Sequence, residues 1–194
     1  DRQIVDEPVS ENKKIELRKK YNLPNGKLFI SASQLIERKN VLFLLKCFLG
    51  LNEKLLLIGD GVLKDECASF ISENKMNNVM LLDFMQRDLL FEYMKASDCF
   101  ITLSKEDIYG HTINEAFANG IPAISSKNVL AAHHLIKDGY NGYLVDIDEK
   151  ENIIKTLAEI KPDLLSANSI KTAKENTIEI MAKQHIDIFK RLLK

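Results

Sequence analysis

The stretch KLLLIGDG, residues 54–61, joins a run of aliphatic residues directly to a glycine-rich turn. The run is short and shows no alternation of apolar and polar residues, which is typical of a strand buried on both faces. A helical pattern follows the turn and continues to about Lys75. A buried strand followed by a helix is the repeating unit of parallel sheets, because parallel strands need a crossover connection.

The same unit recurs on both sides of this stretch. Further short apolar runs are found at residues 27–33 (KLFISAS), 78–83, 98–103 (DCFITL), 121–125 (IPAIS) and 142–145 (GYLV). Helical patterns accompany them over residues 11–20, 40–49 and 88–96, and from about His111 onward. We therefore expect an α/β fold, a Rossmann-like doubly wound parallel sheet of about six strands with helices on both faces.

The chain has 194 residues, which fits a single compact domain with one sheet. Residues 1–26 are predicted to form a lead-in segment with a short helix, and residues 27–168 the Rossmann-like domain. Residues 169–194 are predicted to form one long C-terminal helix. The first residue is Asp1 rather than Met, which favours a piece of a longer protein, although processing could produce the same start.

Composition excludes several classes of protein. The 27 Lys and Arg against 28 Asp and Glu give a net charge of −1, so no overall field attracts nucleic acid or an anionic membrane. The three cysteines, Cys47, Cys67 and Cys99, lack CxxC spacing and are expected to be core thiols of a reducing compartment. No apolar run approaches the roughly 20 residues that cross a bilayer, which favours a cytoplasmic protein.

Ligands of doubly wound sheets bind at the carboxyl ends of the strands, so the loops there are the candidate site. The loop at residues 33–40 places Arg38 and Lys39 just before a helix, where an anion is favoured. Taken alone, that pair is better explained as a solvated charged loop. In the next loop, Gly59 and Gly61 allow close backbone approach to a ligand. An ordinary tight turn is the alternative there.

The stretch DIYGHTINEAFANG, residues 107–120, carries the most specific chemistry. Asp107 and Glu115 bracket the expected start of a helix, and carboxylates suit ligand hydroxyl groups. The amides of Gly110, His111 and Thr112 between them suit a phosphate. Hydroxyls on both sides of a phosphate are the layout of a sugar nucleotide. The alternative is that Asp107 caps the helix and Glu115 interacts with its positive end.

Taken together, these motifs resemble the C-terminal, donor-binding domain of retaining GT-B-fold glycosyltransferases of family 4. The likeness extends from about Lys27 to Leu157, with its elements in the family's order. They are the basic loop at residues 33–39, the Gly-Asp-Gly at 59–61, the pattern S-x-x-D-x-x-G-x-x-x-x-E-A at 104–116, and IKDGYNGYLV at 136–145.

The resemblance implies a role for each matching residue. Lys39 would contact the donor diphosphate, Glu115 the ribose hydroxyls, and Asp107 the hydroxyls of the transferred sugar. The other donor-binding candidates are Gln34, Arg38, Gly59, Met85 (at the base), Glu106, Tyr109, Gly110, His111 and Thr112. The sequence departs from the family at Asp107, which replaces a longer Glu, so that Glu106 could share its task. It also departs at Gln34, which replaces an Arg, and at Ser33, which replaces a Gly.

The family transfers a sugar from a nucleotide donor to an acceptor hydroxyl with retention, and usually without a metal held by a DxD motif. The acceptor, a glycan or a lipid-linked glycan, would bind an N-terminal domain that this chain lacks, so the chain alone is expected to be inactive. At most peripheral association with the inner face of the membrane is expected.

Two alternative functions stay open, a non-catalytic sugar-nucleotide-binding subunit and a nucleotide-sugar epimerase of the same fold. The four histidines have no partners at metal-ligand spacing.

Overall fold

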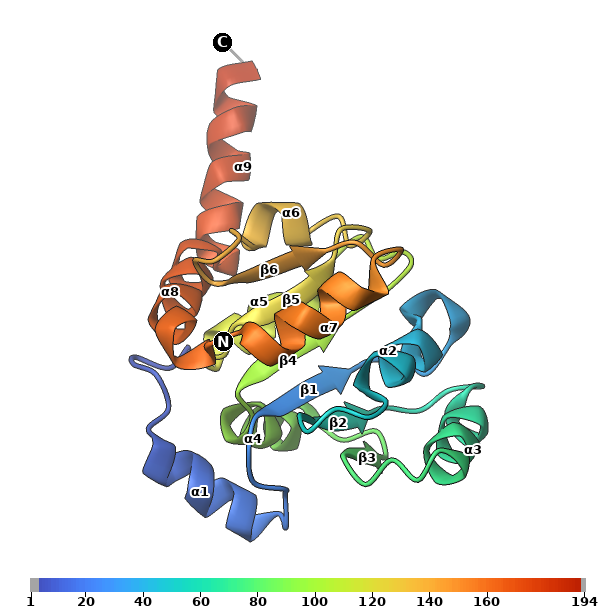
Figure 1. The fold of residues 1–194 in the computed structure, drawn as a ribbon. Coiled ribbons are helices and arrows are strands. Elements are labelled where there is room, and N and C mark those ends of the chain that lie inside the picture. Colours follow the sequence, from blue (N-terminus) through green and yellow to red (C-terminus); the bar gives the residue numbers. More distant parts are fainter. Residues whose placement is uncertain (1–3, 193–194) are drawn as a thin grey trace.

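The computed structural model describes residues 4–192 (Figure 1). Within this range six parallel strands form one sheet in the order β3-β2-β1-β4-β5-β6. The strands are β1 (Leu28–Ala32), β2 (Lys54–Ile58), β3 (Val79–Leu82), β4 (Cys99–Thr102), β5 (Ala123–Ser126) and β6 (Gly142–Val145). The helices are α1 (Glu11–Lys20), the 3-10 helix η1 (Glu37–Lys39), α2 (Val41–Phe48), α3 (Lys64–Glu73), α4 (Arg87–Ala96), α5 (His111–Ala118), α6 (Ala132–Leu135), α7 (Lys150–Glu159), α8 (Pro162–Glu175) and α9 (Ile178–Leu192). The predicted Rossmann-like fold is confirmed.

The strand order creates one switch point, between β1 and β4. From β1 the chain moves outward through β2 to β3, then returns to place β4 on the other side of β1. The loops that follow β1 and β4 therefore leave the same edge of the sheet in opposite directions. A crevice forms between such loops, and this is where doubly wound folds bind ligands.

Two apolar cores cover the two faces of the sheet. Side chains alternate along a strand, so Leu28 and Ile30 face one core while Phe29 faces the other. The first core is completed by α1, α4 and α5, and the second by α2, α3 and α7. Figure 1 shows α7 and α2 on the near side of the sheet, with α4 and α5 behind it. Strand β1 is buried at all five positions, and strands covered on both faces are typically rich in apolar residues.

Helix α1, within the predicted lead-in segment, packs on the sheet domain. Ser10 begins it as the N-cap, accepting a hydrogen bond from the backbone N–H of Lys13. Leu17 is buried in the first core, and the charged side chains of Lys14 and Arg18 are buried beside it. Helix α1 is therefore part of the packed structure, although seven of its ten residues are charged. Residues 1–3 of the predicted lead-in lie outside the described residues.

The C-terminal part forms two helices where the sequence predicts one. Helix α8 begins earlier than expected, with Pro162 in its first turn, and ends at Glu175. The hydroxyl of Thr177 then accepts a hydrogen bond from the backbone N–H of Ile180, which starts α9. Figure 1 shows α9 projecting from the domain, and several of its apolar side chains are exposed. Residues 193–194 of the predicted helix lie outside the described residues.

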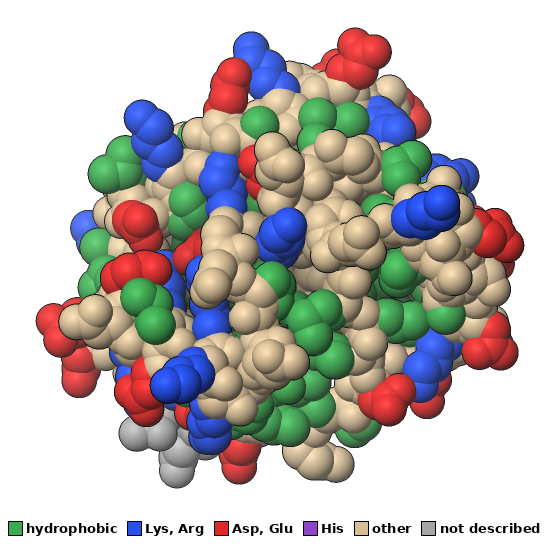
Figure 2. All heavy atoms as spheres, turned by 60° about the horizontal axis from the view of Figure 1, so that its bottom comes forward, with side chains coloured by type: hydrophobic (Ala, Val, Ile, Leu, Met, Phe, Trp, Pro, Cys, Tyr) green, Lys and Arg blue, Asp and Glu red, His purple; other side chains and the backbone are tan. Residues whose placement is uncertain are grey.

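The surface mixes charges of both signs. On the face in Figure 2, acidic and basic side chains are interspersed, and neither sign gathers into one patch. Among residues 4–192, no helix combines the length and the apolar character needed to span a membrane.

We expect the three cysteines to be unreactive in the folded protein. All three are free and buried, and burial raises the pKa of Cys47 and of Cys67 to about 11 and raises that of Cys99 as well. Since the thiolate is the reactive form, Ellman's reagent at pH 8 should label none of them in buffer and all three in denaturant. Rapid labelling of the native protein would contradict the predicted burial.

Candidate functional site

A cleft of about 460 Å³ opens at the carboxyl ends of β1 and β2, beside the starts of α4 and α5. Four of the predicted donor-binding residues line it, Gln34, Gly59, Met85 and Thr112. The rest of its lining is mostly apolar and consists of Ala32, Ser33, Ile58, Asp60, Phe84 and Leu90. An apolar cleft with a few polar groups is typical of a site for a small organic ligand.

The glycines of the β2 loop allow two backbone segments to meet. A Cβ atom at Gly59 would lie 1.9 Å from the carbonyl oxygen of Ser33, and one at Gly61 would lie 2.5 Å from that of Leu35. Two hydrogen bonds join the same segments, from Ser33 N–H to the Ile58 carbonyl and from Leu35 N–H to the Asp60 carbonyl. The space beside Gly59 is therefore filled by the β1 loop. The predicted close approach occurs, but the group that approaches is protein backbone.

An ion pair crosses the switch point. Lys39 Nζ lies 2.5 Å from Asp107 Oδ2, and the two side chains are only 13% and 20% exposed. Burial favours the neutral form of Asp107, but Lys39 and the backbone N–H groups of Tyr109 and Gly110 outweigh it and lower the pKa of the carboxyl group. Asp107 is therefore charged at neutral pH. The sequence proposed both residues for the same site, and the structure brings them into contact.

Further bonds fix the two loops on either side of this pair. The Lys105 N–H donates to the Arg38 carbonyl at 2.8 Å, and the Asn40 amide donates to the Leu103 carbonyl at 3.1 Å. Lys105 also pairs with Glu37. Asn40 adopts a left-handed conformation, which this residue type tolerates better than most. The position of Lys39 is thus set by backbone contacts on both of its sides.

Glu115 has a partner that sequence reasoning missed. Its Oε1 lies 3.4 Å from Nε of Arg87, the first residue of α4. The Arg87 guanidinium also lies 5.0 Å from the centre of the Phe91 ring. Glu115 does not line the cleft, but Thr112 does, one helical turn earlier on the same face of α5. No spacing in the sequence could indicate Arg87, because α4 and α5 meet only in the folded chain.

Asp107 is not the N-cap of α5, contrary to the alternative that the sequence left open. The N-cap is Gly110, in a left-handed conformation, and no side chain makes a capping hydrogen bond there. The rings of Tyr109 and His111 stack beside it at 5.4 Å, and both are exposed. The side chains of Arg38 and Glu106 are exposed too, and neither makes a hydrogen bond or ion pair within residues 4–192.

Potential metal ligands do not gather at this site. Within the described part of the chain, no group of three or more His, Cys, Asp or Glu side chains is arranged to hold a metal ion.

The sequence profile described as "Glycosyl transferases group 1" matches residues 13–177, which is most of the chain. The chain belongs to this family. The predicted resemblance to the C-terminal region of GT-B-fold glycosyltransferases is thereby confirmed. The match begins within α1, in agreement with the packing of that helix on the domain.

Two curated relatives of this group 1 glycosyltransferase domain are bacterial proteins named as glycosyltransferases. N-acetylgalactosamine-N,N'-diacetylbacillosaminyl-diphospho-undecaprenol 4-alpha-N-acetylgalactosaminyltransferase of Campylobacter jejuni is 26% identical over 81% of this chain and 42% of its own length. The lipopolysaccharide core biosynthesis glycosyltransferase LpsE of Rhizobium meliloti is 26% identical over 80% of the chain and 44% of its own length. The chain thus spans less than half the length of these relatives.

Solved structures share the fold. Alr3699/HepE of Anabaena, in complex with UDP and glucose, superposes with a TM-score of 0.76 at 24% identity, covering 94% of this chain and 52% of that one. Sucrose-phosphate synthase of Thermosynechococcus elongatus gives a TM-score of 0.79 at 19% identity, covering 92% and 49%. The glycosyltransferase domain described here therefore corresponds to about half of each of these chains.

Proposed function

We propose that this domain binds the nucleotide-diphosphate sugar donor of a glycosyltransferase at the switch point of the sheet. In the complete protein the sugar would pass to an acceptor hydroxyl with retention at the anomeric carbon. The observation that carries the proposal is the meeting of Lys39 and Asp107 across the switch point, beside an apolar cleft. A cation, a helix N-terminus and a cleft for an organic group suit the three parts of such a donor.

The diphosphate would lie near Lys39 and the start of α5. The ammonium group has three donors, and the backbone N–H groups at His111 and Thr112 belong to the positive end of the helix. Arg38 is exposed on the same loop and can supply a second cation in place of the one lost at Gln34. These groups would stabilise the negative charge that grows on the departing diphosphate, which is usually the largest contribution to catalysis of this kind.

The nucleoside would occupy the cleft. Met85, Phe84 and Leu90 offer apolar contacts to a planar base, and Glu115 would accept hydrogen bonds from the ribose hydroxyls. Its ion pair with Arg87 holds the carboxylate at a defined position. The UDP complex of HepE, which has the same fold, makes uracil the first base to test.

The acceptor would bind a separate N-terminal domain. Without that domain the chain cannot position an acceptor hydroxyl, so the isolated domain should bind the donor and transfer little. The exposed apolar side chains of α9, which include Ile178, Met181 and Phe189, offer a surface for that domain. The names of the relatives support a role in cell-surface polysaccharide or glycolipid synthesis. Binding without transfer by the complete protein would instead favour the non-catalytic subunit.

A thermal-shift panel of UDP-, GDP-, ADP- and dTDP-sugars tests the proposal. A ligand at 100 times its Kd adds about 2.7 kcal/mol to the free energy of unfolding, so at least one nucleotide sugar should raise the Tm by several degrees. Glu115→Ala should remove most of that shift because the ribose contacts are lost. If Glu115 only stabilises α5, the variant should unfold earlier yet respond fully to ligand.

Glu151→Ala provides the control for this substitution. Glu151 is an exposed acid in the first turn of α7, away from the cleft, so its removal should leave the ligand response intact. The proposal fails if none of the four nucleotide sugars stabilises the unmodified domain.

A further inference from the structure

We propose that Asp107 is a positioning residue that acts on the donor through Lys39, and that it does not hold the transferred sugar. The inference rests on the proposed function, since it assigns a task within the same site. It concerns a position where the sequence departs from its family, with an aspartate in place of a longer glutamate. Asp107 would thus contribute to binding of the donor diphosphate, through Lys39.

The bonding of Asp107 is the first observation behind this inference. Oδ2 is already engaged by Lys39 at 2.5 Å, in surroundings that exclude most water. The backbone N–H groups of Tyr109 and Gly110 also favour the charged carboxylate. A carboxylate offers about four acceptor sites, and the ammonium group and the two backbone N–H groups already occupy several of them, which leaves few for the hydroxyls of a sugar.

The second observation is that the backbone of Asp107 is held in place. It forms a β-bridge with Val129, and its carbonyl accepts a hydrogen bond from the Leu130 N–H at 2.8 Å. An aspartate side chain has only one methylene group, so its carboxylate cannot reach far from that fixed backbone. A longer glutamate side chain at this position could extend toward a ligand, whereas the short side chain of Asp107 contacts Lys39 on the opposite loop.

Lys39 gains from this arrangement. A lysine side chain has four rotatable carbons, and ordering it for ligand binding costs conformational entropy. The contact with Asp107 uses one of the three N–H donors and fixes the ammonium at the switch point, which leaves two donors for phosphate oxygens. Because the Lys39 side chain is already ordered before the donor binds, less conformational entropy is lost on binding, and the affinity for the donor is higher.

The test compares the affinity for a nucleoside diphosphate with the affinity for the corresponding nucleotide sugar. If the thermal-shift panel identifies uracil as the base, the two ligands are UDP and UDP-glucose. Isothermal titration of Asp107→Asn should show both ligands weakened by the same factor, about tenfold. Lys39→Met should weaken both ligands as well. In the Lys39→Met background, Asp107→Asn should change neither affinity by more than about twofold, because the pair is already broken.

Lys105→Ala is the matched control. Lys105 pairs with Glu37 between the same two loops, but the pair is exposed, so both affinities should stay within about twofold. Asp107→Glu restores a carboxylate and should recover part of the lost UDP affinity.

Three outcomes separate the inference from the alternatives. Loss of affinity for UDP-glucose with unchanged affinity for UDP would overturn the inference and assign Asp107 to the sugar. An equal gain for both ligands would also overturn it, because Asp107 would then compete with the diphosphate for Lys39. If the unmodified domain bound neither the nucleoside diphosphate nor the nucleotide sugar of any base tested, the proposed function itself would be contradicted.

Discussion

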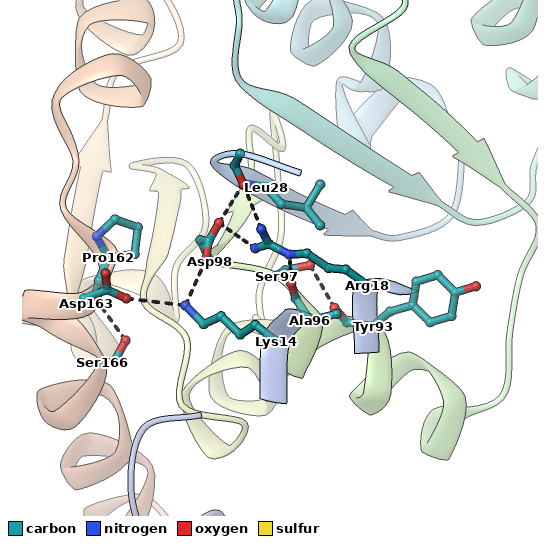
Figure 3. A network of polar contacts seen from close by, with 11 residues as sticks. Lys14, Arg18, Leu28, Tyr93, Ala96, Ser97, Asp98, Pro162, Asp163 and Ser166 are labelled. Atoms are coloured by element: carbon teal, nitrogen blue, oxygen red, sulfur yellow. Dashed lines mark hydrogen bonds and ion pairs between the residues drawn. The ribbon is translucent and has the colours of Figure 1, made fainter. Parts of the chain in front are cut away.

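Replacing Asp98 with alanine is expected to lower the free energy of unfolding by about 3–5 kcal/mol. Asp98 lies between two buried cations of α1, as Figure 3 shows. Its Oδ1 is 2.8 Å from Lys14 Nζ, and its Oδ2 is 2.9 Å from an Arg18 guanidinium nitrogen. The Leu28 N–H donates to the same Oδ2. The substitution would leave Arg18 buried without a counter-charge and Lys14 with only the exposed Asp163, which is far more costly than losing an exposed pair.

The pKa of Lys14 agrees with this account. Burial lowers it, but Asp98 and Asp163 together raise it above its ordinary value of 10.5. A group whose pKa is raised on folding stabilises the protein below its ordinary pKa and loses that effect as the pH rises through the folded value. The contribution of Lys14 is therefore complete at neutral pH and declines only above about 10.5.

Asp163→Ala is the control for Asp98→Ala. Asp163 also pairs with Lys14, at 3.4 Å, but its side chain is 85% exposed. Its loss should cost less than about 1 kcal/mol. Urea denaturation of both variants at neutral pH measures the difference. Equal effects for the two aspartates would show that the buried network is not what attaches α1 to the sheet.

Replacing Gly59 with alanine is expected to cost more than about 4 kcal/mol, a loss typical of severe steric conflict. The new Cβ would lie 1.9 Å from the Ser33 carbonyl oxygen, a backbone atom that cannot rotate away. The backbone at Gly59 also has φ +154°, which side chains disfavour. The β1 and β2 loops would have to separate, and both line the cleft. Any folded Gly59→Ala protein should therefore also bind the donor more weakly.

Gly139→Ala separates the steric conflict from backbone strain. Gly139 has φ +70°, but no atom lies within 4 Å of the position its Cβ would take. This variant should lose only about 1–2 kcal/mol, the cost of a left-handed residue. Urea denaturation of both variants provides the measurement. If Gly59→Ala lost no more than Gly139→Ala, the close approach of the two loops would not be essential to the fold.

Sequence patterns located the six strands to within two residues and predicted helices α1 to α5, but not α6 or α7. Residues 54–58 could be assigned because a short, nearly unbroken aliphatic run is typical of a strand buried on both faces in a parallel sheet. The break between α8 and α9 was missed, since Thr177 acts through a local hydrogen bond within a pattern that otherwise continues as helix. The attachment of α1 was missed because its buried face carries Lys14 and Arg18, which look like surface residues in a sequence.

At the site, the sequence indicated which residues to consider but not their partners. Lys39 and Asp107 were both proposed as donor contacts, and the finding that they bind each other came from the structure. The partner of Glu115 lies on another helix, where nothing marked Arg87 as different from other exposed cations. The glycine at position 59 was correctly singled out, while the group that fills the space beside it was not.

By itself, the sequence determined the class of fold and the residue types in the loops at the carboxyl edge of the sheet, where we propose the site. These follow from local hydrophobic periodicity and from loop chemistry, which depend only on neighbours along the chain. Only the tertiary structure decided that the Lys39 ammonium meets the Asp107 carboxylate across the switch point and that Asp98 joins α1 to the sheet. Such pairings arise from the order in which the strands assemble, which brings together residues that no local pattern relates.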